Sequence, residues 1–185
     1  RYAIGIEFCG TQYRGWQTQQ AGVITVQESI EKVLSSIANE PIVLHGAGRT
    51  DAGVHAKHQV LHTDLPSDTP IENLTFRLNQ LLPEDIRVIS TSWAPPNFHA
   101  RFTPVSRTYQ YKIIDGGQVT APLNRYDSVE WFRKLDINLM KIIYLIFFSS
   151  TRNWCFDRQK LFGLQDLFLS FSTLDFRCSK YYILF

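Results

Sequence analysis

The opening of the chain carries apolar positions with two different periods. In residues 2–8 (YAIGIEF) every second side chain from Ile4 is apolar, which predicts a strand with one buried face. Within residues 26–37 the apolar positions recur at helical spacing, and Thr25 with Glu28 forms a capping box that begins a helix. Pro41 follows closely, so the helix is expected to end before it.

Further elements are expected up to residue 93. Apolar runs bounded by turn residues predict strands at 41–45 (PIVLH), 58–65 (HQVLHTDL) and 86–93 (IRVISTSW). A second helix is expected from Thr69–Glu72 to Pro83, with an apolar stripe made of Ile71, Leu74, Leu78 and Leu81. The order β-α-β-β-α-β predicts an α+β, ferredoxin-like (split βαβ) fold, an antiparallel sheet with both helices on one face.

Beyond this pattern the chain changes character. Residues 106–114 (SRTYQYKII) alternate as a strand that either extends the sheet or begins a second one. We expect a ferredoxin-like domain at 1–105, a strand and linker at 106–135, and an atypical hydrophobic tail at 136–185 that forms an incomplete or divergent second domain. The apolar run 137–148 is about half the ~20 residues of a bilayer span, so a buried helix or strand is expected there and no membrane anchor.

The composition bears on the possible partners of the chain and on its cellular compartment. Lys and Arg total 19 against 17 for Asp and Glu, and this net charge of +2 neither requires nor excludes a polyanionic partner. The three cysteines are scattered and form no CxxC pair, which argues against a disulfide framework or a cysteine zinc site and favours the cytoplasm. The first residues have no pattern of a secretion signal, and the missing initiator Met predicts a fragment.

The stretch 46–56 (GAGRTDAGVHA) is the strongest candidate for chemistry. A dinucleotide loop is disfavoured because Asp51 takes the place of the third glycine and would face pyrophosphate. A phosphate loop is disfavoured because Val54 and His55 stand where Lys and Ser or Thr should follow. Two interpretations remain: a turn in which Asp51 hydrogen-bonds its own backbone, or an ionised Asp51, paired with Arg49, that acts as nucleophile or base beside small residues that admit a flat ligand.

Several motifs together resemble the tRNA pseudouridine synthase A family. They are GRTDAGVHA at 48–56, GIEFCGTQYRGWQTQ at 5–19, TVQESIEKVL at 25–34, and FHARF at 98–102 followed by RTYQY at 107–111. The resemblance covers residues 1 to about 115, and the linker-like APLNRYDSVEWF at 121–132 also fits it. It implies an isomerase that converts uridine to pseudouridine in the anticodon stem-loop of tRNA, without metal or redox cofactor.

The resemblance also implies roles for particular residues. Asp51 would be the catalytic nucleophile, and whether it attacks the sugar, attacks the base or removes a proton stays open. Tyr109 would stack on the flipped uracil and assist proton removal from C5, although by itself it is equally a core-facing strand tyrosine. Arg49 would hold Asp51 and keep the base out of the helix, or would be a plain ion-pair partner.

Other polar residues have weaker assignments. Arg101, Arg107 and Lys112 are candidates for RNA phosphate contacts or are surface charges, and His99 either reaches RNA or caps a strand. His55, His58 and His62 are not expected to bind a metal, because their spacing suits a helix whereas the segment alternates as a strand.

The resemblance finally implies partners and an alternative. Family members have a second domain and are homodimers that bind tRNA, and the segment after residue 135 resembles no part of that domain. The alternative is therefore a truncated, inactive relative that keeps the fold and RNA affinity.

Overall fold

The computed structural model describes residues 1–67, 69, 72–105, 107–110, 112–140 and 182–184. The chain divides into two compact units, which are treated separately below. The first contains Arg1–Tyr109 together with the C-terminal residues Tyr181–Phe185, and the second contains Gln110–Lys180.

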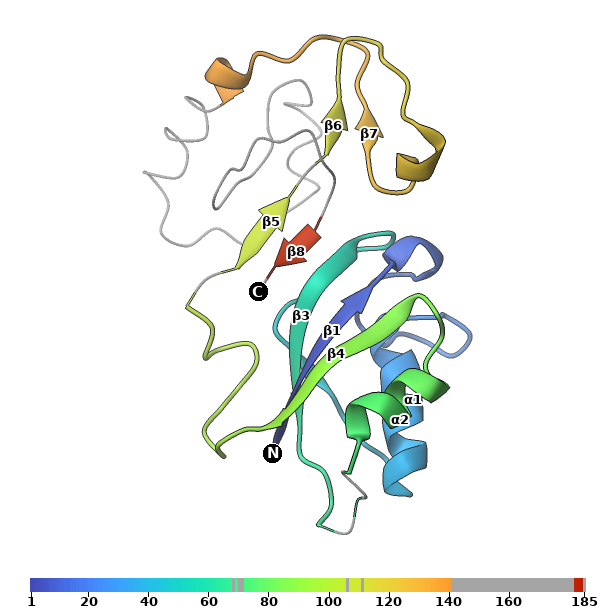
Figure 1. Ribbon diagram of the computed structural model, residues 1–185, viewed down its shortest axis with the longest axis vertical. Coiled ribbons are helices and arrows are strands. Elements are labelled where there is room, and N and C mark those ends of the chain that lie inside the picture. Colours follow the sequence, from blue (N-terminus) through green and yellow to red (C-terminus); the bar gives the residue numbers. More distant parts are fainter. Residues whose placement is uncertain (68, 70–71, 106, 111, 141–181, 185) are drawn as a thin grey trace. The chain divides into compact units, whose positions relative to one another are not determined.

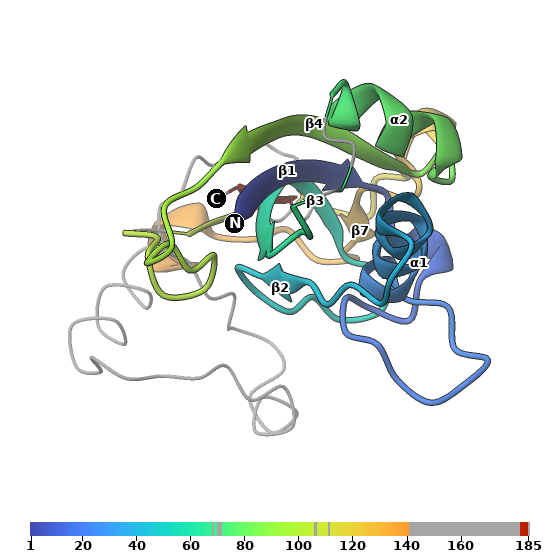
Figure 2. The same ribbon diagram turned by 90° about the horizontal axis from the view of Figure 1, so that it is seen from below.

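The first unit is a sheet, antiparallel in its first four strands, with two helices on one face (Figure 1 and Figure 2). The strand order is β4-β1-β3-β2, and every neighbouring pair among these four strands is antiparallel. The bounds are β1 Tyr2–Phe8, α1 Val26–Ala38, β2 His45–Gly46, β3 His55–Thr63, α2 Leu74–Leu81 and β4 Ile86–Trp93. This arrangement confirms the predicted α+β, ferredoxin-like fold.

The core lies between this sheet and its helices. Ile4 and Ile6 of β1 are fully buried, as are Ile30 and Leu34 of α1. Glu7, between Ile6 and Phe8, is exposed on the opposite face because side chains alternate along a strand. The period seen in the sequence therefore correctly separates the covered face from the open one.

Helix α1 begins and ends as predicted. The Oγ1 atom of Thr25 accepts a hydrogen bond from the backbone N–H of Glu28 at 3.3 Å, and Asn39 ends the helix in the left-handed conformation with φ 56°. The Glu28 carboxylate pairs with Lys32 one turn later, at 2.7 Å.

The strand predicted at 41–45 is wrong in its bounds, since β2 comprises only His45–Gly46. Ile42 and Leu44 are buried, as the alternation predicts. However, the N–H of Ile42 donates to Ser35 Oγ and that of Leu44 to Glu31 Oε1, both at 2.9 Å. The segment is extended, but its donors bond to side chains of α1 instead of to a neighbouring strand.

The second helix begins later than predicted. Helix α2 starts at Leu74, after Asn73 at φ 55°, and has no side-chain cap. Its buried residues are Leu74 and Leu78, whereas Leu81 is exposed and Leu82 is buried in its place. The buried positions Leu74, Leu78 and Leu82 are four residues apart, so the prediction that Leu81 lies in the core is wrong. Ile71 lies outside the described residues.

The strand predicted at 106–114 is interrupted. Strand β5 covers Thr108–Gln110 and belongs to the main sheet, in which β8 (Tyr182–Leu184) pairs in parallel with β3 and lies between β3 and β5. Strand β6 (Ile113–Ile114) pairs in parallel with β7 (Val129–Glu130) in the second unit. Both alternatives for this segment are therefore partly right.

The element expected within 137–148 lies mostly outside the described residues, as does nearly all of the tail to residue 185. None of the helices in the described part of the chain has the length and hydrophobicity that crossing a bilayer requires.

Candidate active site around the Asp51 loop

Asp51 lies in the loop that connects β2 to β3, at residues 47–54. The N–H of Val54 donates to the carbonyl of Asp51 at 3.2 Å, which closes a turn over residues 51–54. Gly53 occupies that turn with φ 79°, a conformation that favours glycine. The Asp51 side chain is exposed, so the turn presents a carboxylate to solvent on a tightly folded backbone.

A second segment, Tyr13–Trp16, holds this loop through its backbone. The N–H of Trp16 donates to the carbonyl of Thr50 at 3.0 Å, and the N–H of Gly53 donates to the carbonyl of Tyr13 at 3.3 Å. These two hydrogen bonds hold the backbone before and after Asp51. We call residues 13–16 the anchor segment.

Gly15 permits this close approach. Its φ is 96°, and a Cβ atom at this position would lie 2.6 Å from the Thr50 carbonyl oxygen and 3.3 Å from the Asp51 carbonyl carbon. Any side chain would push the loop away from the anchor segment. Glycine is therefore required here by both conformation and space.

The anchor segment is itself fixed to helix α1. The N–H of Val26 donates to the Gly15 carbonyl at 3.3 Å, and that of Gln27 donates to the Trp16 carbonyl at 3.0 Å. The first N–H groups of a helix have no partner within the helix, and here two of them find the anchor segment. Hydrogen bonds thus connect α1 to the Asp51 loop without a break.

Two buried aromatic side chains complete the support. Trp16 packs against Gly46, where a Cβ atom would lie 2.8 Å from the indole, and its ring centroid is 6.3 Å from that of Phe8. The Tyr13 hydroxyl donates to Asp85 Oδ1 at 2.6 Å. Burial, followed by the hydrogen bond to Asp85, raises the pKa of Tyr13, which keeps the hydroxyl a donor.

Arg49 and Asp51 lie on the same loop, two residues apart, and both are exposed. In the part of the chain that the structure describes, no ion pair joins them, although Asp51 has interactions with other groups. The expected pairing of Arg49 with Asp51 stays a prediction.

Tyr109 lies on β5 of the same sheet, and its side chain is outside the described residues. Its neighbour Arg107 is half-buried and donates to the carbonyls of Ala47, at 3.2 Å, and Arg101. Arg107 therefore connects the chain before β5 to the start of the Asp51 loop by a hydrogen bond. Its guanidinium has a structural use that the sequence did not suggest.

His99 and Arg101 lie in the connection between β4 and β5. The Nδ1 atom of His99 accepts from the N–H of Arg101 at 3.1 Å, and its carbonyl accepts from Phe102 and Thr103, so His99 caps a turn. The Arg101 side chain is exposed, with its guanidinium carbon 5.7 Å from the centroid of the Phe102 ring. These bonds stabilise a turn, and the expected RNA contact of His99 stays a prediction.

Lys112 belongs to the second unit and lies in a local network. Its ammonium pairs with Asp127 at 3.2 Å and donates to Asn124 Oδ1 at 3.2 Å. With 14% of its side chain exposed, it is neither a free surface charge nor an accessible cation. The role expected for Lys112 as an RNA contact therefore has no support in its surroundings.

The histidines of β3 have structural partners. His55 Nδ1 accepts from the Gly10 N–H at 3.1 Å, and buried His62 Nδ1 accepts from the Ala100 N–H at 3.1 Å. The His62 ring lies 4.8 Å from His45 and 4.5 Å from His99, and burial, assisted by these two neighbours, lowers the pKa of His62 to about 4. Among the described residues no group of His, Cys, Asp or Glu is arranged to hold a metal ion.

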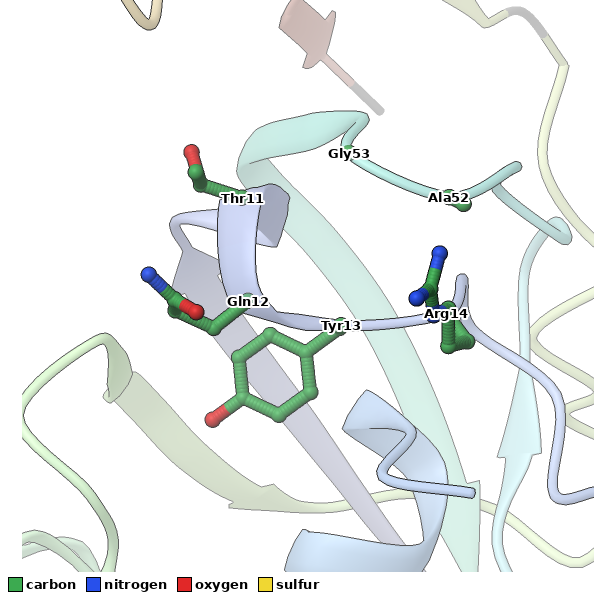
Figure 3. Close-up of a pocket in the computed structure, with 6 residues that line it drawn as sticks. All are labelled: Thr11, Gln12, Tyr13, Arg14, Ala52 and Gly53. Atoms are coloured by element: carbon green, nitrogen blue, oxygen red, sulfur yellow. The ribbon is translucent and has the colours of Figure 1, made fainter.

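A pocket adjoins the Asp51 loop (Figure 3). It is lined by Thr11, Gln12, Tyr13, Arg14, Ala52 and Gly53, and has a volume of about 350 Å³. The local sequence pattern indicates no role for Arg14 or for the anchor segment. The signal that could have identified the anchor segment is Gly15, a glycine next to Trp16 whose backbone approaches that of Thr50.

Comparison of the sequence with known proteins identifies the family of this chain. A family model described as tRNA pseudouridine synthase matches residues 4–103, which include the anchor segment and the Asp51 loop. The chain is 48% identical to tRNA pseudouridine synthase A of Acinetobacter baylyi over 142 residues, 77% of this chain and 52% of that protein.

Two further relatives carry the same name. The protein of the same name from Acinetobacter baumannii (strain AYE) is 49% identical over 140 residues, 76% of this chain and 52% of the relative. That from Frankia casuarinae is 44% identical over 141 residues, 76% of this chain and 51% of the relative. The chain spans about half the length of the curated relatives it matches. The resemblance inferred from the Asp51 motif is thus confirmed, and the chain belongs to the tRNA pseudouridine synthase family.

Proposed function

We propose that this chain carries the catalytic carboxylate of an isomerase that converts uridine to pseudouridine in tRNA, with Asp51 as that carboxylate. The observation that supports this most strongly is the exposed Asp51 side chain on a loop whose backbone is bonded on both sides to Tyr13–Trp16. Catalysis requires a reacting group held in one place, and a loop fixed by backbone bonds satisfies that requirement. Family membership supports the same assignment.

The proposed reaction balances without a co-reactant. The bond from C1′ of the ribose to N1 of uracil breaks, the base rotates, and a bond forms from C1′ to C5. The hydrogen on C5 leaves as a proton and N1 gains a proton, so substrate and product are isomers and nothing is oxidised or reduced. A carboxylate can attack the sugar or base and leave again, or accept the departing proton, and Asp51 is the group proposed to do so.

The remaining residues are assigned supporting roles. Arg49, exposed on the same loop, would orient Asp51 and hold the target base outside the RNA helix. Tyr109, on β5, would stack on the uracil; such stacking is worth about 1–3 kcal/mol and offsets much of the cost of extruding a base. Exposed Arg101 remains a candidate phosphate contact, with His99 positioning it through the turn.

The substrate is proposed to be tRNA, at uridines of the anticodon stem-loop. The names of the relatives support tRNA, and the family resemblance supports the stem-loop and a homodimer. A cytoplasmic location follows from a tRNA substrate and from scattered cysteines, of which Cys9 is free and exposed. A 1–105 domain followed by a linker and a second domain remains the proposed organisation.

Release of tritium from tRNA labelled at C5 of uridine tests the proposal. Wild-type chain should release tritium, Asp51→Ala should not, and Asp64→Ala should match wild type because Asp64 pairs with Arg1 on the surface. Wild-type release no greater than that of Asp51→Ala would refute the enzymatic proposal. Salt-sensitive tRNA binding under that outcome would instead identify an inactive relative that keeps RNA affinity.

A further inference from the structure

The pocket beside the Asp51 loop has the features of an anion site (Figure 3). Two of its six lining residues, Ala52 and Gly53, directly follow Asp51 in the chain. The other four belong to residues 11–14, and the six include one cation and no acidic side chain. A ligand in this pocket therefore lies next to the proposed catalytic carboxylate.

The backbone of Arg14 is held by hydrogen bonds on both its N–H and its carbonyl, whereas its side chain is exposed. Its N–H donates to the Ile24 carbonyl at 3.0 Å, and its carbonyl accepts from Gln19 Nε2 at 3.0 Å. The side chain is exposed, and Figure 3 shows the guanidinium extending beside Ala52. Within the described parts of the chain, this guanidinium donates to no protein group, in contrast to that of Arg107.

The chemistry of the Arg14 side chain suits a phosphate ligand. A guanidinium is planar and binds phosphate oxygens through two parallel N–H bonds. In Figure 3 the side chains of Thr11 and Gln12 extend to the other side of the segment, so the guanidinium of Arg14 is the polar side-chain group on the side of Ala52. Contacts with phosphates fix the register of a nucleic acid on a protein.

We propose that Arg14 binds a backbone phosphodiester of the RNA strand adjacent to the uridine that Asp51 attacks. This inference rests on the proposed function. A phosphate held there would set the position of the ribose relative to Asp51, because Ala52 and Gly53, which line the pocket, belong to the same turn as Asp51. Arg14 is thus a substrate-positioning residue.

RNA binding at increasing salt tests this site, with an anticodon stem-loop RNA as the probe. Arg14→Gln should bind roughly fivefold more weakly and lower the slope of log affinity against log salt by about 0.7 to 1, the value for one lost phosphate contact. Arg14→Lys should keep the slope. Lys32→Gln, which removes an equal charge from an exposed position on α1, should behave like wild type.

RNAs with one neutral methylphosphonate linkage near the target uridine identify the phosphate. One such RNA should weaken wild-type binding as much as Arg14→Gln does, and should weaken Arg14→Gln no further. If Arg14→Gln binds like Lys32→Gln while wild type still releases tritium, the phosphate site is refuted and the proposed function stands. Additive losses from Arg14→Gln and every neutral linkage would also refute it, and absence of Asp51-dependent release would refute the proposed function instead.

Discussion

Gly15→Ala perturbs the contact on which the position of Asp51 depends. Alanine at φ 96° is strained, and a strained left-handed residue costs about 1–2 kcal/mol. The new Cβ atom would also lie 2.6 Å from the Thr50 carbonyl oxygen, which the Trp16 N–H holds in place. Relieving this overlap requires the loop to move and weakens that hydrogen bond, a further loss of about 1–2 kcal/mol. We expect a total destabilisation of about 2–4 kcal/mol.

Gly22→Ala is the matched control. Gly22 has φ 91°, and a Cβ atom there would meet nothing within 4 Å, so this variant carries the strain alone. Urea unfolding should give a free energy of unfolding for Gly15→Ala at least about 1 kcal/mol below that of Gly22→Ala. Displacing Asp51 by up to an ångström should also lower kcat about a hundredfold in Gly15→Ala, while Gly22→Ala keeps wild-type kcat. Equal stability and equal rates in the two variants would refute the claim that the anchor segment positions Asp51.

Two further predictions concern Tyr13 of the anchor segment and the buried His62 of β3. Tyr13→Phe removes the donor to Asp85 and should lower the free energy of unfolding by about 1–3 kcal/mol, measured in urea at pH 7, where a change below 0.3 kcal/mol would contradict the role of that bond. His62, with its pKa lowered to about 4, stays neutral when folded while the unfolded side chain takes up a proton below its usual value near 6.5. Stability should therefore fall as the pH drops from 6.5 to 4, by at most about 3 kcal/mol, and His62→Gln should flatten this dependence; an identical slope in both proteins would contradict it.

Periodicity was sufficient for the central elements of the fold. Strands β1 and β4 and helix α1 have regular patterns and clear ends, so their bounds agree with the sequence. The segment 41–45 was misassigned because burial of Ile42 and Leu44 alternates as in a strand, while the partners of their N–H groups are side chains of α1. Alternation predicts which side chains are buried and does not identify the partners of the backbone.

The site was predictable only in part for a similar reason. The motif around Asp51 identified the loop, but the anchor segment holds that loop through N–H and carbonyl groups, which every residue except proline possesses. The pairing of Lys112 with Asp127 is not indicated by the sequence around either residue, because 15 positions separate the two. Long-range pairing of a charge cannot be deduced from its local pattern.

The most direct test of the account is single-turnover tritium release from C5-labelled tRNA by Asp51→Asn. Asparagine keeps the size of the side chain and removes only the carboxylate, so the loop and its bonds to the anchor segment should remain. If Asp51 is the reacting group, tritium release by Asp51→Asn should not exceed that of the sample without protein. Its stability and tRNA affinity should be close to wild type, and Asp64→Asn should retain full activity. Release by Asp51→Asn at the wild-type rate would contradict the claim that Asp51 is the reacting group.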